Sequence, residues 1–342
     1  MNRTLRYRRS GRLVSILALT LLCVGFVSCR AEKSKAEASS KERQLIVGFS
    51  QIGAESAWRK CNTRSIRDAA ESYGIQLLFD NAEQKQENQI KAIRSFIAYR
   101  VDVIAFVPIV SDGWENVLRE ARDAGIPVLI TDRKIRISEE GLHAGFIGTD
   151  SFEEGRNAGR FLVRKFLEKN PTRQEAAKQV RVFELTGTIG SSVATGRAMG
   201  FREVIANHPE IEIVHSESGD FLRSKGYEIA KRCISDLLVV DAIYSHNDSM
   251  TLGIIDALKE AGIAPGKDVV IITIDAEQAS IDALRRGEVN CVIECNPKTG
   301  PAIMDLAVRL AEGESIPWIV HVDEQVFTEF DNDLDAIESR GY

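Results

Sequence analysis

Short apolar runs that alternate with helical patterns, twice over, constrain the fold of this chain more than any other feature. The runs are rich in Val, Ile, Leu and Phe, which is typical of parallel strands covered by helices on both faces. The expected strands are Leu45–Phe49, Ile75–Phe79, Val103–Val107, Pro127–Ile130, an edge-like segment at His143–Gly148, and then Val180–Leu185, Ile211–Ser216, Ala242–Ser245, Val269–Ile274 and Cys291–Glu294. The repeated alternation predicts an α/β fold with two similar, doubly wound parallel-sheet lobes.

The segments between these strands show helical periodicity. In Gln86–Tyr99 three isoleucines fall on one face, and Thr251–Ala261 is expected to be a helix that ends at a glycine. Between the two series of strands no Gly/Ser linker occurs, and the chain passes directly into a helix that begins near Phe152. So short a crossover suits two lobes that face each other across a cleft and close about a hinge on a ligand bound between them.

The first 43 residues have a different character. Five arginines without an acid precede the uncharged apolar stretch Leu13 to Val27, a pattern that predicts a signal peptide over residues 1–28 and is too short for a comfortable membrane span. The ending Phe26-Val27-Ser28-Cys29 is similar to a relaxed lipobox, with Phe where Leu is usual, and favours lipidation of Cys29. Ordinary cleavage of a secreted protein is the alternative. Residues 29–43 are expected to form a lipid-anchored flexible tether.

Charge and cysteine usage narrow the class of protein. Removal of residues 1–28 with their five arginines changes the formal net charge from −6 to −11, which argues against a nucleic-acid partner. Of the remaining cysteines Cys61, Cys233, Cys291 and Cys295, no pair has zinc-site spacing, and the last two lie too far apart in a strand to bridge. Isolated buried thiols are expected, and one bridge among them remains open.

The loop after the first strand carries an unusual set of side chains. Glu55, Trp58 and Arg59 bring a carboxylate, an indole and a guanidinium within five residues of one another. In open α/β sheets ligands bind beyond the carboxyl ends of the strands. Charged groups hydrogen-bond hydroxyls and an indole packs on the C–H face of a sugar ring, so the set suits a polyol. The alternative is that Trp58 is simply the first core residue of the following helix.

Further polar or aromatic residues follow other expected strands. Asp132 and Arg133 follow the fourth strand, Asn247 the eighth and Asp275 the ninth, and Phe221 lies in the loop after the seventh. A polar residue after a strand is usually a helix cap. These residues are nevertheless many, and all lie at the same predicted edge of the sheets, which favours a shared binding site.

In combination these segments resemble the sugar receptors of the periplasmic-binding-protein type I family, in the ribose-binding group and most closely its galactofuranose-binding branch. The resemblance covers residue 44 to the C-terminus. It rests on Val47–Arg59, Gln84–Ala92, Asp132-Arg133, Glu184–Gly190, Ser218–Gly226, His246–Asp248 and Ile274-Asp275. It implies a first lobe of residues 44–150 plus about 296–322 and a second lobe of 151–295 plus about 323–342.

The resemblance also implies roles for individual residues. Asp132 and Arg133 would hold sugar hydroxyls from the first lobe, Asn247 and Asp275 would do so from the second, and Phe221 would pack on the sugar.

The face of the site specific to the galactofuranose-like branch would come from Glu55, Trp58 and Arg59. Ser192 is a weaker candidate for ligand contact. Arg197 is a second weaker candidate, better explained as a structural ion-pair residue.

These observations predict an extracytoplasmic, lipid-anchored protein that captures a monosaccharide by hinge closure and delivers it to the permease and ATPase of an ABC importer. The protein is expected to be monomeric and to need no cofactor or metal. A receptor feeding a chemotaxis or two-component sensor is the alternative. A repressor of the same fold would need a helix-turn-helix ahead of the first strand, where this chain has none.

An enzyme is disfavoured by the motifs. The five histidines show no H-E-x-x-H spacing, and no G-x-S-x-G elbow is present. Glu55 and Asp132 could in principle serve as a glycosidic acid/base pair, but hydroxyl binding is their more economical role.

Overall fold

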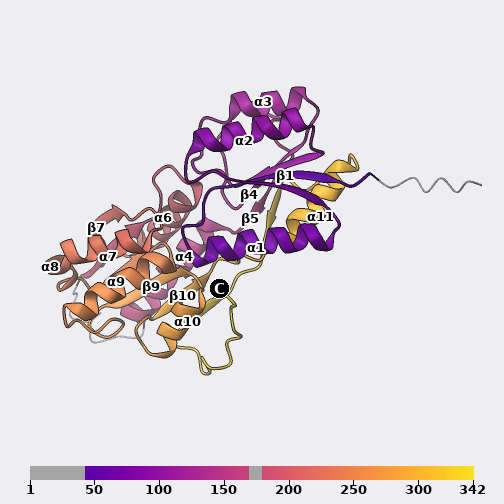
Figure 1. Cartoon of the computed structure of the whole chain (residues 1–342). Helices are drawn as coiled ribbons and strands as arrows, with labels where there is room; N and C mark the ends of the chain where they lie inside the picture. Colours follow the sequence, from indigo (N-terminus) through magenta and orange to yellow (C-terminus); the bar gives the residue numbers. More distant parts are fainter. Residues whose placement is uncertain (1–42, 169–178) are drawn as a thin grey trace, which may run out of the picture. The chain divides into compact units, whose positions relative to one another are not determined.

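A computed structural model describes residues 43–168 and 179–342 of the chain, and the predicted signal peptide, Cys29 and nearly all of the predicted tether lie outside the described residues. The described chain forms two α/β lobes, each built on a six-stranded sheet (Figure 1). The predicted fold class is therefore confirmed.

The first sheet is parallel throughout and has the order β11-β5-β4-β3-β1-β2. Helices α1 and α11 cover one face, and α2 and α3 cover the other (Figure 1). The bounds of these elements are β1 Ile46–Gln51, α1 Ala57–Ser72, β2 Gln76–Asn81, α2 Gln86–Tyr99, β3 Val103–Phe106, α3 Glu115–Asp123, β4 Val128–Thr131, β5 Gly145–Gly148, α11 Gly300–Ala311 and β11 Ile319–His321.

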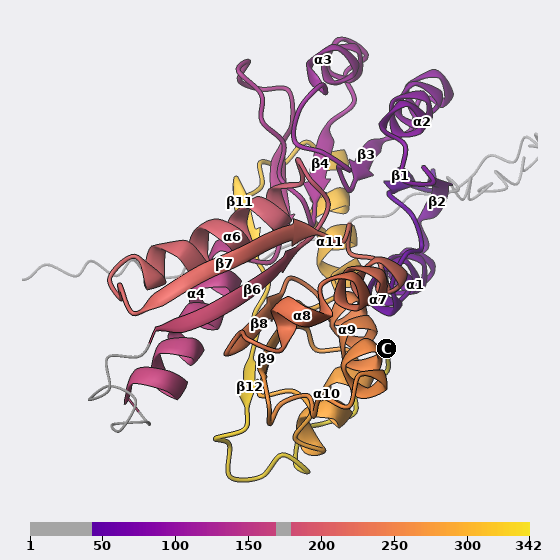
Figure 2. The same cartoon turned by 90° about the vertical axis from the view of Figure 1, so that its left-hand side faces the viewer.

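The second sheet has the order β12-β10-β9-β8-β6-β7 and is parallel except for β12, which pairs antiparallel with β10. Helices α4 and α6 pack on one face, and α7, α9 and α10 on the other (Figure 2). The bounds are α4 Ser151–Val163, a π-helical turn η1 Arg164–Glu168, β6 Val180–Thr186, α6 Ser192–Ile205, β7 Ile211–Ser218, α7 Arg223–Arg232, α8 Ile234–Leu237, β8 Ala242–Ser245, α9 Asp248–Glu260, β9 Val270–Asp275, α10 Gln278–Arg285, β10 Cys291–Glu294 and β12 Val326–Thr328.

The described chain passes between the two sheets in three short segments, 149–150, 295–299 and 322–325. The first of them ends in a helix cap, because the Asp150 carboxylate accepts hydrogen bonds from the backbone N–H groups of Phe152 and Glu153. The second is held by Asn62 of α1, whose side-chain amide donates to the Pro297 carbonyl and the Thr299 hydroxyl at 3.0 Å each. Hydrogen bonds therefore fix two of these connections at defined points.

The sequence placed most strands within one or two residues of their observed bounds and was wrong about the sheet edges. The segment predicted as edge-like, β5, lies between β4 and β11 instead. The strands β11 and β12 were not predicted, because each has only three residues, which are too few to show a periodicity. Helix α9 begins at Asp248 rather than Thr251, since the Asn247 side chain caps it by accepting from the Met250 N–H.

Two further observations bear on the class of protein. Among the described residues, no helix is both long enough and apolar enough to cross a bilayer. The four cysteines of the described residues, Cys61, Cys233, Cys291 and Cys295, are free and buried. No disulfide therefore constrains the movement of one described lobe against the other.

Helices α4 and α6 approach each other closely because glycines line their contact. A Cβ atom on Gly200 would lie 1.9 Å from the Phe152 carbonyl oxygen, and one on Gly155 would lie 2.2 Å from the Arg197 carbonyl oxygen. Both distances are far below van der Waals contact, so the backbone of one helix occupies the space of a side chain on the other.

We expect Gly200→Ala to destabilise the protein by about 1–3 kcal/mol through overpacking, although alanine is intrinsically the better helix former. The urea midpoint of unfolding measures the effect. Met199→Ala, on the exposed side of the same helix, is the control and should change stability by no more than about 0.5 kcal/mol. Equal midpoints for Gly200→Ala and the parent would show that α4 and α6 can move apart without loss of stability.

Candidate functional site

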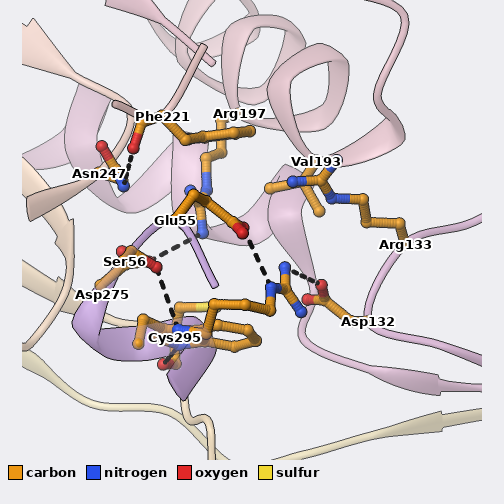
Figure 3. Close-up of a pocket in the computed structure, with 12 residues that line it drawn as sticks. Glu55, Ser56, Asp132, Arg133, Val193, Arg197, Phe221, Asn247, Asp275 and Cys295 are labelled. Atoms are coloured by element: carbon orange, nitrogen blue, oxygen red, sulfur yellow. Dashed lines mark hydrogen bonds and ion pairs between the residues drawn. The ribbon is translucent and has the colours of Figure 1, made fainter. Parts of the chain in front are cut away.

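A pocket lies where the carboxyl ends of strands of both sheets meet, and Figure 3 shows the side chains that line it. All eight principal residues predicted from the sequence line it, together with Arg197. The complete lining is Glu55, Ser56, Trp58, Arg59, Asp132, Arg133, Val193, Arg197, Phe221, Asn247, Asp275 and Cys295. The site therefore draws on both lobes.

Arg59 organises the first-lobe side of the pocket. Its Nε donates to Glu55 Oε1 at 3.2 Å and its Nη2 donates to Asp132 Oδ2 at 2.7 Å, so that Glu55 and Asp132 point toward the same guanidinium (Figure 3). The three side chains are at most 10% exposed. Arg59 Nη1 and Glu55 Oε2 are buried and have no hydrogen-bond partner. Two polar atoms are thus free to bind a ligand.

Trp58 combines both roles weighed from the sequence. It lines the pocket, and the Arg59 guanidinium lies over its ring at 4.5 Å from the centroid. It is also only 5% exposed and packs with apolar residues of the second lobe. Its indole N–H donates to the Cys295 carbonyl at one of the crossings between the lobes. The residue is therefore a wall of the pocket and a contact between the lobes.

Arg133 differs from the other pocket arginines because no carboxylate pairs with it. Its Nη1 donates to the Ile109 carbonyl at 3.0 Å, and its guanidinium lies 5.3 Å from the centre of the Phe221 ring. Burial, assisted by the positive charge of Arg59, lowers the pKa of Arg133 to about 10. A buried guanidinium with spare N–H groups is a strong donor for a ligand oxygen.

Arg197 organises the second-lobe side. Its Nε donates to Glu154 Oε2 at 2.6 Å, its Nη1 donates to the His246 carbonyl, and its Nη2 lies 3.6 Å from Asp275 Oδ1. The ion pair with Glu154 agrees with the structural role expected for Arg197, although its side chain also reaches the pocket. Burial raises the pKa of Asp275 well above its usual range, against the opposing effect of Arg197 and with the support of nearby acids.

Phe221 and Asn247 are held by backbone geometry. Phe221 has a φ of +63°, and its ring lies where a Cβ on Gly187 would be, at 1.9 Å. The Asn247 side chain caps α9 through its oxygen and donates through its nitrogen to the Phe221 carbonyl at 3.4 Å. Any ligand contact by Asn247 would therefore share atoms with these internal hydrogen bonds.

Ser192 does not line this pocket. Its hydroxyl instead accepts a hydrogen bond of 2.7 Å from the Lys134 backbone N–H, across the two lobes. A second hydrogen bond between the lobes runs from the Ser111 N–H to the Gly190 carbonyl at 3.0 Å. The lobes are therefore in direct contact around the pocket.

Three lining residues were missed by the sequence analysis: Ser56, Val193 and Cys295. The Ser56 hydroxyl caps α1 by accepting from the Arg59 N–H at 3.0 Å, a role that a serine three residues before Arg59 could have suggested. Cys295 has no such signal, because it reaches the pocket only through the crossing of the chain between lobes. Val193 is likewise an ordinary apolar residue at the start of a helix.

Two groups of described side chains have residue types that can bind a metal, with their ligand atoms within 4.8 Å of one another. In one, Glu154, Cys295 and Glu324 lie beside Arg197, which pairs with Glu154. In the other, made up of His215, Glu217 and Cys233, Glu217 pairs with Arg232. The neighbouring guanidinium disfavours a cation at either place.

Similarity to known proteins identifies the family of this chain. Residues 47–315 match the sequence profile described as a periplasmic binding protein domain. This match covers well over half of the chain, and the chain belongs to that family. Membership places the protein outside the cytoplasm.

Similar proteins are known by name. The galactofuranose-binding protein YtfQ of Escherichia coli (strain K12) is 44% identical over 262 residues, which is 75% of this chain and 80% of the relative. A crystal structure from Mycobacterium smegmatis in complex with β-D-fucofuranose is 41% identical with a TM-score of 0.79, and the match covers 83% of this chain and 91% of that one.

A third relative is the periplasmic binding protein component of the arabinose ABC transporter from Shewanella sp. ANA-3, bound to α- and β-L-arabinofuranose. It is 40% identical with a TM-score of 0.77, over 83% of this chain and 92% of the other. The predicted resemblance to the ribose- and galactofuranose-binding group is confirmed. The expectation of a binding protein rather than an enzyme is confirmed by the same relatives.

Behind the second-lobe side of the pocket, Glu184 is a fully buried carboxylate. It accepts hydrogen bonds from Arg202 Nη1 at 2.7 Å and Nη2 at 2.6 Å and from Ser216 Oγ at 2.5 Å. Burial would raise the pKa of Glu184, but the His246 ring 3.4 Å away and hydrogen bonds from Arg202 and Ser216 outweigh it and lower the pKa to about 2.

Because the folded-state pKa of Glu184 is depressed, its stabilising contribution is complete above about pH 4.5 and is lost as the pH falls toward 2. We expect Glu184→Gln to lower the free energy of unfolding at pH 7 by up to about 3 kcal/mol. Arg202 is half exposed, so solvent screens its ion pair with Glu184 and makes the measured loss smaller. The variant should also lose less stability than the parent between pH 4.5 and pH 2.5. Urea unfolding at a series of pH values measures both, and parallel pH profiles would contradict the assignment.

Proposed function

We propose that this protein captures a neutral monosaccharide in its furanose form and hands it to the membrane permease of an ABC importer. The observation that carries the proposal is the convergence of hydrogen-bonding groups from both lobes on one pocket. Arg59, Asp132 and Arg133 come from the first lobe, and Asn247 and Asp275 come from the second. A polyol that contacts both sets at once would favour closure of the lobes over opening.

The relatives suggest which sugars to consider. The named ligands β-D-fucofuranose and L-arabinofuranose, and galactofuranose, all have a five-membered ring. Chemically, fucose is galactose without the hydroxyl on C6, and arabinose lacks C6 altogether. The three sugars therefore share the ring and differ at its exocyclic end. We propose that the pocket of this chain recognises the same ring.

The charges of the pocket favour a neutral ligand. Arg59 is paired with Glu55 and Asp132, and Arg197 is paired with Glu154. A charged ligand group would compete with these ion pairs in a buried site, where displacing one partner of a pair is costly. Hydroxyl groups can instead accept from the unpaired Arg133 and donate to the carboxylates.

Binding would work by hinge closure. In the lobes we propose, 44–150 with 296–322 and 151–295 with 323–342, the pocket opens when the lobes separate about the three crossings. The sugar stabilises the closed form by its greater affinity for it. The closed form would then dock on a permease that works with an ATPase, as a monomer held at the membrane by a lipid on Cys29.

A panel of sugars tests the ligand class. We expect galactose, fucose and arabinose, which contain furanose forms at equilibrium, to raise the melting temperature of the protein, because a ligand that binds only the folded state stabilises it. Ribose is the control for a pentose of different configuration. If none of the panel raises the melting temperature, the proposed sugar class is wrong.

Arg133→Ala tests the site. With the best sugar of the panel, calorimetry should show weaker binding by about 1.5–3 kcal/mol for each charge-assisted hydrogen bond lost. Arg136→Ala is the matched control, since Arg136 is three-quarters exposed, pairs with Asp112 and does not line the pocket. Unchanged affinity in Arg133→Ala would place the sugar elsewhere.

The lipid anchor has its own test. In cells, Cys29→Ser should abolish incorporation of labelled palmitate and release the protein from the membrane fraction. Cys23→Ser, within the predicted signal peptide, is the control and should leave labelling unchanged. If the parent protein incorporates no label and is itself found outside the membrane fraction, ordinary cleavage of a secreted protein is favoured.

A further inference from the structure

Both N–H groups of Trp58 donate to acceptors outside the first lobe. The backbone N–H donates to Glu277 Oε1 at 3.1 Å, and the indole N–H donates to the Cys295 carbonyl. Although Trp58 belongs to α1, its ring packs among second-lobe residues such as Phe161 and Ile274. The first turn of α1 is therefore attached to the second lobe.

The position of Glu277 at this helix end is physically meaningful. The first N–H groups of a helix have no partner within the helix, and a negative charge is favourable there. Helix α1 has no acidic residue in its own first turn, and the Ser56 hydroxyl satisfies only the Arg59 N–H. Glu277, which follows β9 in the second lobe and is 3% exposed, supplies the missing carboxylate.

We propose that Glu277 is a positioning residue that caps α1 across the two lobes and thereby stabilises the closed form in the absence of sugar. This inference rests on the proposed hinge closure but not on the identity of the sugar. Because α1 also carries Arg59, the cap fixes the orientation of the first-lobe side of the pocket as the lobes meet.

The local structure shows that the side chain can be changed without unfolding its loop. The Glu277 backbone N–H donates to Asp248 Oδ2 at 2.6 Å, and Asp248 is held in turn by the Thr273 hydroxyl at 2.6 Å. These bonds do not involve the Glu277 carboxylate. Apart from α1, its hydrogen-bonding neighbour is the Ser249 hydroxyl at 3.4 Å.

The separation of the lobes in sugar-free protein tests the proposal. Spin labels on Tyr99→Cys in the first lobe and Leu238→Cys in the second, both more than half exposed, report this distance by pulsed electron resonance. The mature chain would carry Cys29→Ser so that no accessible native thiol competes. We expect two populations in the parent, with the shorter distance corresponding to the closed form.

We expect Glu277→Ala to lower the closed-to-open ratio roughly 5- to 30-fold, as the loss of a hydrogen-bonded carboxyl group at a buried helix N-terminus implies. For Glu277→Gln, whose amide oxygen still accepts from Trp58, the closed-to-open ratio should lie between those of Glu277→Ala and the parent. This variant keeps the test valid if Glu277→Ala does not fold. The matched control is Glu288→Gln, which removes a second-lobe carboxylate that pairs with Lys259 and Arg286 instead.

The outcomes separate this proposal from the proposed function. An unchanged distance distribution in Glu277→Ala, or a parent that is wholly open without sugar, would overturn the role of Glu277. If the distance distribution shifts in Glu277→Ala while no sugar of the panel binds the parent, the role of Glu277 is supported and the proposed sugar class is wrong. In a variant that retains sugar binding, the dissociation constant should rise by the same factor as the closed fraction of the sugar-free protein falls.

Discussion

Arg59 and Arg197 can be buried between the lobes because each is neutralised by carboxylates of its own lobe. Arg59 is paired with Glu55 and Asp132 within the first lobe, and Arg197 is paired with Glu154 and approaches Asp275 within the second. Removing one partner of a buried ion pair typically costs 3–5 kcal/mol. If the pairs crossed between the lobes, opening would break them. Since they do not, the lobes can separate without breaking the ion pairs of Arg59 and Arg197.

The backbone at the strand ends serves the same site. Asp132 and Phe221 lie beyond the ends of strands and Asp275 is the last residue of β9, and their φ values of +61°, +63° and +132° are in the region that favours glycine. Such conformations cost about 1–3 kcal/mol each and persist only when the surrounding structure holds them. The result is that three side chains from separate loops turn toward one pocket.

Much of this arrangement could be predicted from the sequence, because continuous apolar runs identify parallel strands and the residues after them must meet at one edge. This is why Asp132, Asn247 and Asp275 could be expected to lie together. The strands β11 and β12 could not be predicted, since three residues are too few to show a periodicity. Ser192 follows a strand as well, but its hydroxyl is used between the lobes, and a sequence cannot distinguish the two uses.

The contacts between the lobes and the contacts to a ligand must stay in balance. The apparent affinity of a receptor that binds in its closed form is its intrinsic affinity multiplied by the closed fraction. Every contact between the lobes that stabilises the closed form therefore raises the apparent affinity. A ligand can shift the equilibrium only by its differential affinity for the two forms, so contacts that held the lobes fully closed would leave it nothing to change. A single carboxylate at a helix end, worth up to about 2 kcal/mol, satisfies both limits. Trp58 lies at the meeting point of the two kinds of contact, because its N–H groups bind the second lobe and the crossing while its ring remains part of the pocket wall.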